Sequence, residues 1–203
     1  LWLEEKGAKR WLFPALVALI GAASIVGVGA MAPRLEAPAP KASIRVCTYN
    51  IQQGYDAGGL KNYDGQLALL RQVEADVIGL QESDTNRISG GNSDVVRYLA
   101  DRLDMYSYYG PKTAPGTFGI ALLSRYPIER PRTFYMYSAG EQTATIEAQI
   151  RVGDRAYTVY VTHLGNDGPI VQQEAILQAI AGKENVVLMG DFNFRPGTAQ
   201  YQL

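Results

Sequence analysis

VVLMGDFNFRPG (residues 186–197) is an apolar run that ends in charged and amide side chains. Short runs rich in Val, Leu and Met are typical of strands buried on both faces. Asp191 and Asn193, which end this run two residues apart, contribute nothing to the apolar packing of a buried strand. Since side chains alternate along an extended chain, both point to the same face. The stretch therefore predicts a buried strand that delivers two polar groups to one place.

Three further apolar runs end in the same way. They are IRVCTYN (44–50), which ends in Asn50, DVIGLQES (76–83), which carries Glu82, and YTVYVTHLG (157–165), which carries His163. One polar residue at a strand end often only starts a loop, and a single His is more often structural than catalytic. Ligands bind at the carboxyl ends of strands in open α/β folds, so four such ends together predict one site.

Helical patterns lie between the strands. They are QLALLRQVEAD (66–76), SDVVRYLADRL (93–103) with Ser93 as the expected N-cap, and GPIVQQEAILQAIAG (168–182). Further strands joined by hairpins are expected within 119–128 and 132–161, the second with a turn at Gly153-Asp154. Helices mixed with consecutive hairpins predict an α/β fold with mixed sheets rather than one parallel sheet.

The N-terminal part of the chain has a different composition. WLFPALVALIGAASIVGVGAM (11–31) holds 21 residues without a charge, enough to cross a hydrocarbon core of about 30 Å. A signal peptide is the alternative to a transmembrane helix, because AMA at 30–32 resembles a cleavage site. Three basic residues precede this run and two follow it before position 42, which weakly favours an extracytoplasmic or luminal position for the rest. We predict a juxtamembrane segment (1–10), a transmembrane helix (11–31), a Pro-rich linker (32–43) and a domain (44–203).

The polar groups at the strand ends suit one chemistry. Glu82 with Asn50 offers the oxygen ligands of a hard cation, which predicts Mg²⁺ or Mn²⁺. Zinc is not expected, because the chain has one Cys and one His. Asp191 can orient or deprotonate a water, and the amide of Asn193 can donate to a phosphoryl oxygen. His163 can donate to the same oxygens or carry a proton, so the set predicts metal-assisted hydrolysis of a phosphate ester.

Five motifs, in order, resemble those of the endonuclease/exonuclease/phosphatase superfamily. They are TYNIQ (48–52), IGLQES (78–83), GIALLSRYPI (119–128), VTHLG (161–165) and MGDFNFRP (189–196). The resemblance covers nearly all of residues 44–198 and implies a DNase I-like fold, a four-layer α/β/β/α sandwich of two mixed sheets. It also implies that Asn50 and Glu82 bind the metal, that Asp191 and Asn193 handle the attacking water and the phosphoryl oxygens, and that His163 contacts the scissile phosphate.

A narrower resemblance rests on loop sequences. Residues 49–92 and 108–124 look similar to the C-terminal domain of membrane proteins that remodel GPI anchors by introducing ceramide. This resemblance implies further membrane helices upstream and a lipid-linked, GPI-type phosphate as substrate at a membrane. Arg87 and Lys112 are candidates for binding that phosphate or an anionic head group, although solvated loop charges are an equal alternative.

Three functions fit these observations. The first is a membrane-tethered phosphodiesterase or lipid-remodelling domain, and the second is a nuclease of the same superfamily. From residue 42 onward, 14 Lys and Arg face 17 Asp and Glu, whereas a duplex binder normally has a basic surplus. We therefore do not expect nucleic acid as the partner. The third is a non-catalytic domain that recognises a lipid head group with the same pocket.

The resemblance implies a further motif late in the sequence. Members of the superfamily complete the site with a Ser-Asp-His-type motif, and this chain has no His after His163. We expect the domain to be truncated at its C-terminus, with that motif lying beyond Leu203. Loss of general acid–base catalysis typically costs about 10²–10⁴-fold in rate. An uncovered sheet edge is also an aggregation liability, so we expect residues 1–203 alone to be nearly inactive and poorly stable.

Overall fold

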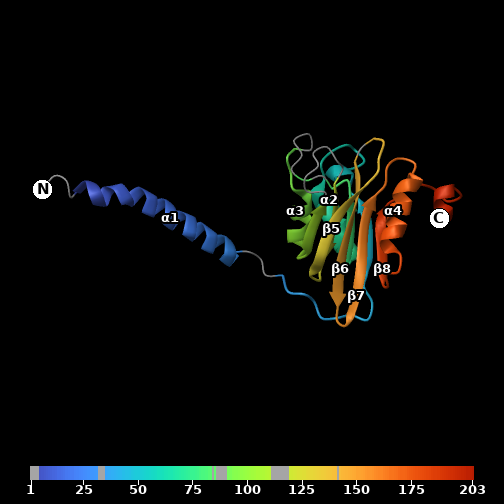
Figure 1. Ribbon diagram of the computed structural model, residues 1–203, viewed down its shortest axis with the longest axis horizontal. Coiled ribbons are helices and arrows are strands. Elements are labelled where there is room, and N and C mark those ends of the chain that lie inside the picture. Colours follow the sequence, from blue (N-terminus) through green and yellow to red (C-terminus); the bar gives the residue numbers. More distant parts are fainter. Residues whose placement is uncertain (1–4, 32–34, 84, 86–90, 111–118, 141) are drawn as a thin grey trace. The chain divides into compact units, whose positions relative to one another are not determined.

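A computed structural model describes residues 5–31, 35–83, 85, 91–110, 119–140 and 142–203 (Figure 1). The chain divides into two compact units, Leu1–Leu35 and Glu36–Leu203. The first unit holds one helix, α1 (Glu5–Met31). Its segment Trp11–Val28 has a mean hydropathy of 2.2 and none of its residues is buried. By length and composition this helix can cross a membrane, although a signal sequence meets the same criteria.

The second unit contains eight strands and three α-helices within its described residues. The strands are β1 (Val46–Asn50), β2 (Val77–Gln81), β3 (Tyr106–Gly110), β4 (Ile120–Ser124), β5 (Ile128–Met136), β6 (Thr143–Val152), β7 (Arg155–His163) and β8 (Val186–Asp191). The α-helices are α2 (Tyr63–Val73), α3 (Val95–Leu103) and α4 (Ile170–Ile180), with short 3₁₀ turns η1 (Gln52–Gly54) and η3 (Ala199–Gln202).

Two four-stranded mixed sheets form the centre of this unit. The first has the order β1-β2-β4-β3, in which β1 and β2 are parallel and the other pairs antiparallel. The second has the order β5-β6-β7-β8, in which only β7 and β8 are parallel. A two-residue turn with Gly153 at a φ of 61° joins β6 to β7, as predicted.

Alternating side chains give each sheet two apolar faces. On the first sheet, Ile78 and Leu123 pack with the helices α2 and α3, whereas their sequence neighbours Val77 and Leu122 pack against the second sheet. The outer face of the second sheet packs against α4 through Ile176. The layers are therefore helix, sheet, sheet and helix, which confirms the predicted α/β/β/α sandwich.

The start of α3 differs from the prediction by one residue. Asp94 is the N-cap, and its carboxylate accepts a hydrogen bond from the Arg97 N–H at 2.9 Å. Ser93 instead donates to the Gly91 carbonyl at 3.5 Å, so the expected Ser93 cap is wrong. Both residue types are good N-caps, and the ionised side chain of Asp94 is the stronger acceptor beside the helix N-terminus.

The last residues of the predicted linker are docked on the second unit. Lys41 forms an ion pair of 2.7 Å with the buried Asp76, and the carbonyl of Ala39 accepts a hydrogen bond from the Tyr126 hydroxyl. Burial raises the pKa of Asp76, but hydrogen bonds from the Arg45 N–H and from Lys41, together with nearby positive charge, outweigh it and lower that pKa overall. This contact lies where the chain enters β1 and β2, at their amino ends.

Replacing Asp76 with Asn should destabilise the second unit by about 2 kcal/mol at pH 7, because two charge-assisted hydrogen bonds are weakened. The folded pKa of Asp76 is lowered, so its contribution is full above the unfolded pKa of about 3.9 and is lost as the pH falls through the folded value. The difference between wild type and variant should therefore shrink in acid. Urea unfolding followed by tyrosine near-UV circular dichroism measures it, with the exposed Glu184→Gln as the control that should change little.

Candidate functional site

Four strands bring polar side chains to one end of the sandwich. The first sheet places Asn50 at the end of β1 and Glu82 just after β2. The second places His163 at the end of β7 and Asp191 at the end of β8. Since β1 packs against β8 across the two sheets, these ends meet. The structure thus brings together residues that lie up to 141 positions apart in the sequence.

Asn50 bridges the two acidic side chains of the site. Its Nδ2 donates to Glu82 Oε1 at 2.9 Å and to Asp191 Oδ2 at 3.0 Å. Its Oδ1 accepts a hydrogen bond from the Gln52 N–H at 3.0 Å, which fixes the orientation of the amide. One neutral amide therefore holds two carboxylates close together. Two negative charges in this position would attract a cation.

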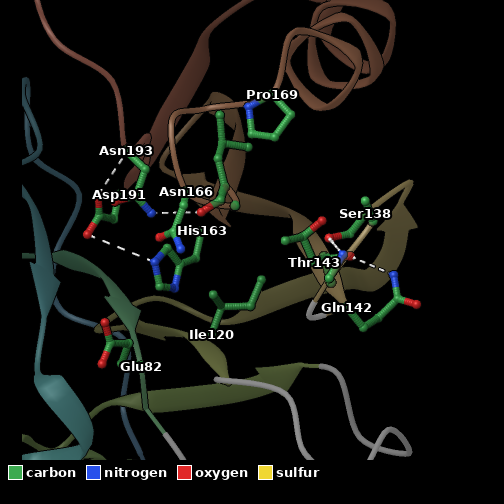
Figure 2. Close-up of a pocket in the computed structure, with 15 residues that line it drawn as sticks. Glu82, Ile120, Ser138, Gln142, Thr143, His163, Asn166, Pro169, Asp191 and Asn193 are labelled. Carbon is green, nitrogen blue, oxygen red and sulfur yellow. Dashed lines mark hydrogen bonds and ion pairs between the residues drawn. The ribbon is translucent and has the colours of Figure 1, made fainter.

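His163 lies beside Asp191 on the neighbouring parallel strand. The two residues are partners in the β7–β8 register, and His163 Nε2 is 4.0 Å from Asp191 Oδ2 (Figure 2). The His163 side chain is 16% exposed and that of Asp191 is 34% exposed, so both are accessible from the cavity without being freely solvated. A protonated His163 would form an ion pair with Asp191 in this position.

Two site residues have a left-handed backbone. Glu82 has a φ of 47° and Asn193 a φ of 53°, a conformation that is uncommon for residues other than glycine. The Asn193 N–H donates to Asp191 Oδ1 at 3.2 Å, and Asn193 Nδ2 donates to the Leu164 carbonyl at 2.8 Å. Asn193 thereby orients Asp191 and ties the end of β8 to the end of β7, while the second N–H of its amide remains to donate.

A cavity of about 450 Å³ opens at this end of the sandwich. Glu82, His163, Asp191 and Asn193 line it (Figure 2). The rest of its polar lining was not predicted from the sequence and comes from Ser138, Gln142, Thr143 and Asn166. The signal for Ser138, Gln142 and Thr143 was confined to the polar stretch 138–143, which matches no catalytic pattern, and Asn166 lies in the loop after β7 without a signal of its own.

Asn50 contacts both carboxylates but is not among the residues that line this cavity. Asn50 lines a second cavity of about 760 Å³, which also includes Asp191 and Asn193. Arg87 and Lys112 lie outside the described residues, and their assignment as substrate-binding residues stays a prediction.

The side chains at the strand ends fit one class of metal ion. The described part of the chain contains no group of three or more His, Cys, Asp or Glu side chains that could hold a metal. Mg²⁺ needs fewer protein ligands, because it keeps several waters and uses one or two carboxylates together with substrate phosphate. Glu82, Asn50 and Asp191 supply such a set of oxygen donors. Asn50 now turns its Nδ2 toward both carboxylates, so its Oδ1 would have to rotate inward to bind the ion.

Comparison with known proteins gives consistent results. Residues 41–203 match the family described as "PGAP2IP, C-terminal nuclease-like domain". The chain is 40% identical over 97 residues to the protein cwh43 of Schizosaccharomyces pombe, an alignment that covers 47% of this chain and 10% of that protein. The chain thus spans about a tenth of the length of this relative.

Similar solved structures share the fold. An endonuclease/exonuclease/phosphatase from Beutenbergia cavernae superposes with a TM-score of 0.63 at 22% identity, covering 74% of this chain and 47% of that one. TDP2 of D. rerio, complexed with a single-strand DNA product, gives 0.64 at 16% identity, covering 80% and 64%. A mannosyl-6-phosphatase from Bacteroides thetaiotaomicron gives 0.59 at 16% identity, covering 79% and 69%. At these identities the likeness concerns the fold, which is DNase I-like.

The left-handed backbone of Asn193 yields a test of the site's construction. Asn193→Ala should lower the free energy of unfolding by about 1–2 kcal/mol, because it removes the bond to the Leu164 carbonyl and places Ala at a positive φ. Asn193→Gly loses the same bond without the backbone penalty, so it should be more stable than the Ala variant by about 1 kcal/mol. Urea unfolding of both variants measures the difference, and an equal loss in both would contradict the strained backbone.

Proposed function

The chain belongs to the family of PGAP2IP C-terminal nuclease-like domains, and we propose that it is a Mg²⁺- or Mn²⁺-dependent phosphodiesterase acting on a lipid-linked phosphate at a membrane. The observation that carries this proposal is the meeting of Glu82, His163 and Asp191 at one cavity, with Asn50 hydrogen-bonded to both carboxylates. Two carboxylates and an amide offer oxygen ligands for a hard cation, and an imidazole can donate to phosphoryl oxygens, so the set suits metal-assisted hydrolysis of a phosphate ester.

Each residue has a part in the proposed reaction. Glu82 and Asn50 would hold the metal ion, which supplies stabilisation of negative charge on the phosphoryl oxygens. Asp191 orients the attacking water and accepts its proton as the water oxygen bonds to phosphorus and the bond to the leaving alcohol breaks. His163 and the free N–H of Asn193 donate to the phosphoryl oxygens as their charge grows.

The lipid-linked substrate is supported by three observations. The segment Trp11–Val28 can cross a membrane, which would keep the second unit near a bilayer surface. The acidic surplus from residue 42 onward does not favour a nucleic acid. The loop sequences resemble those of GPI-remodelling membrane proteins, and we therefore propose a GPI-type phosphodiester and an extracytoplasmic or luminal position.

Replacement of Glu82 tests the metal assignment. Glu82→Gln should weaken Mg²⁺ or Mn²⁺ binding at least about tenfold, because a charged ligand becomes a neutral one of the same size. Isothermal titration calorimetry gives the affinity, with the exposed Glu74→Gln near the opposite end of the strands as the matched control. An unchanged affinity in Glu82→Gln would remove this residue from the metal site.

Comparison of two substrates tests the reaction. The protein should hydrolyse a lipid-linked phosphodiester in vesicles faster than it nicks plasmid DNA under the same Mg²⁺ concentration. Asp191→Asn should reduce the lipid reaction by about 10²–10⁴-fold, since the proton acceptor is lost. Efficient nicking with inert vesicles would favour a nuclease. Binding of vesicles without turnover, unchanged in Asp191→Asn, would favour the non-catalytic recognition domain.

A further inference from the structure

Exposed side chains differ between the two ends of the strands. The turns at the amino ends of β1 and β2, each fully described, are 74–76, 104–105, 125–127, 153–155 and 181–185. They contain no exposed large apolar side chain, and they expose charged groups such as Glu74 and Glu184. The opposite end, where the cavity opens, exposes Tyr137, Ile170 and Val171. Figure 1 shows the β6–β7 turn and the start of α4 at these opposite ends of the second unit.

The three apolar side chains flank the cavity. Tyr137 is 72% exposed, Ile170 42% and Val171 45%. Tyr137 directly precedes Ser138 in the chain and Ile170 directly follows Pro169, and both of these neighbours line the cavity (Figure 2). We call Tyr137, Ile170 and Val171 the apolar rim. A surface that covers the rim would therefore lie next to the cavity.

A buried side chain joins the segments that carry the rim. Gln172 in the first turn of α4 is fully buried, and its Nε2 donates to the Tyr137 carbonyl at 2.9 Å. Its Oε1 accepts from the Gly165 N–H at 2.9 Å, in the loop that follows His163. The end of β5, the start of α4 and the loop after β7 are thus tied together. The rim is therefore held in a fixed relation to the imidazole of the site.

The residue types of the rim suit the boundary of a bilayer. Tyrosine is favoured there because it joins an apolar ring to a polar hydroxyl, and Ile and Val are apolar throughout. The exposed Leu177 lies two turns along α4 from Ile170, so the solvent side of this helix remains apolar beyond its first turn. The segment Trp11–Val28 can cross a membrane, which would keep a bilayer within reach of this surface.

The docked linker does not by itself turn the cavity toward lipid. Lys41 pairs with Asp76 at the amino ends of the strands, and the cavity opens at the carboxyl ends. Residues 32–38, between α1 and the docked Ala39, can span roughly 25 Å when extended, whereas β1 spans roughly 17 Å. The linker is thus long enough for the cavity end to reach a bilayer, and a contact at that end would be needed to hold it there.

We propose that the apolar rim inserts into the interfacial layer of a lipid bilayer and directs the mouth of the cavity toward lipid-linked phosphates. The substrate in this inference rests on the proposed function, but the contact with lipid is made by the rim itself and does not require turnover. In this position a phosphate in the head-group layer enters the cavity without its lipid leaving the bilayer. The contact also restricts the orientation of the second unit, which the membrane span alone does not.

Labels at single cysteines test the contact in the 203-residue chain, held by α1 in phosphatidylcholine nanodiscs. Cys47 is the one cysteine of the chain, so a Cys47→Ser background takes one NBD fluorophore per variant. The rim variant is Val171→Cys, and Leu69→Cys on α2 is its matched control with the same exposure of 45%. Glu184→Cys reports the opposite end of the strands. A spin-labelled lipid should quench the label at 171 severalfold more strongly than the other two, and aqueous iodide should quench it less.

A second comparison shows whether the rim side chains or the fluorophore itself bind lipid. Tyr137→Ser combined with Ile170→Ser, both at exposed positions, should remove most of the lipid quenching at 171. Unchanged quenching in this double variant would overturn the inference. Near-UV circular dichroism checks that the variant remains folded.

The outcomes separate this inference from the proposed function. Equal quenching of all three labels would overturn the rim contact, whatever the rate of hydrolysis. Protection of the label at 171 from iodide without quenching by lipid would also overturn it, because a second protein copy would then cover the rim. Selective lipid quenching at 171 that the double variant removes would support the contact. If the same protein hydrolysed no lipid-linked phosphodiester, that result would count against the proposed function alone.

Discussion

The close approach of the two sheets is the constraint on which the site depends. Gly79 in β2 faces the second sheet, and a Cβ placed there would lie 3.2 Å from side-chain atoms of Val161 and Met189. Such a contact is tighter than most Cβ contacts in proteins, so the side chains of Val161 and Met189 would have to shift by a few tenths of an ångström to admit even a Cβ. The hydrogen bond of 3.0 Å between Asn50 and Asp191 joins the sheets at their carboxyl ends and tolerates little change in that separation.

Holding the polar groups of the site close together costs free energy, and it also creates electrostatic attraction for a cation. Glu82 and Asp191 are like charges held by one amide, and repulsion between them favours any cation placed nearby. Glu82 and Asn193 also have a positive φ, a conformation that costs free energy and persists only where the surrounding structure imposes it. The apolar layers on both faces of both sheets supply the stability that offsets these costs.

Local patterns predicted the mixed sheets and the polar strand ends, whereas the four-layer arrangement was implied by the resemblance to the endonuclease/exonuclease/phosphatase superfamily. Buried runs such as 76–83 reveal strands by composition, and polar residues that close them stand out against an apolar background. The cavity lining at the β5–β6 connection gave no such signal, because Thr143 is an ordinary β-branched strand residue and its place beside the cavity depends on how distant strands pack. The left-handed backbone at Glu82 was equally invisible, since this conformation is imposed by tertiary contacts rather than by residue type. The choice of Asp94 over Ser93 as a cap shows that boundaries between equally suitable neighbours are set by local geometry.

The linker contact and the candidate functional site lie at opposite ends of the same strands. Lys41 pairs with Asp76 at the amino ends of β1 and β2, while Asn50 and Glu82 lie at the carboxyl ends of the same two strands. A five-residue strand such as β1 spans roughly 17 Å, farther than the separation of about 7–10 Å beyond which substitutions without shared partners usually act independently. Substitutions at the two ends should therefore add in their effects on stability. The linker contact and the cavity have no hydrogen-bond partner in common. A substitution at one of them should therefore leave the geometry of the other unchanged.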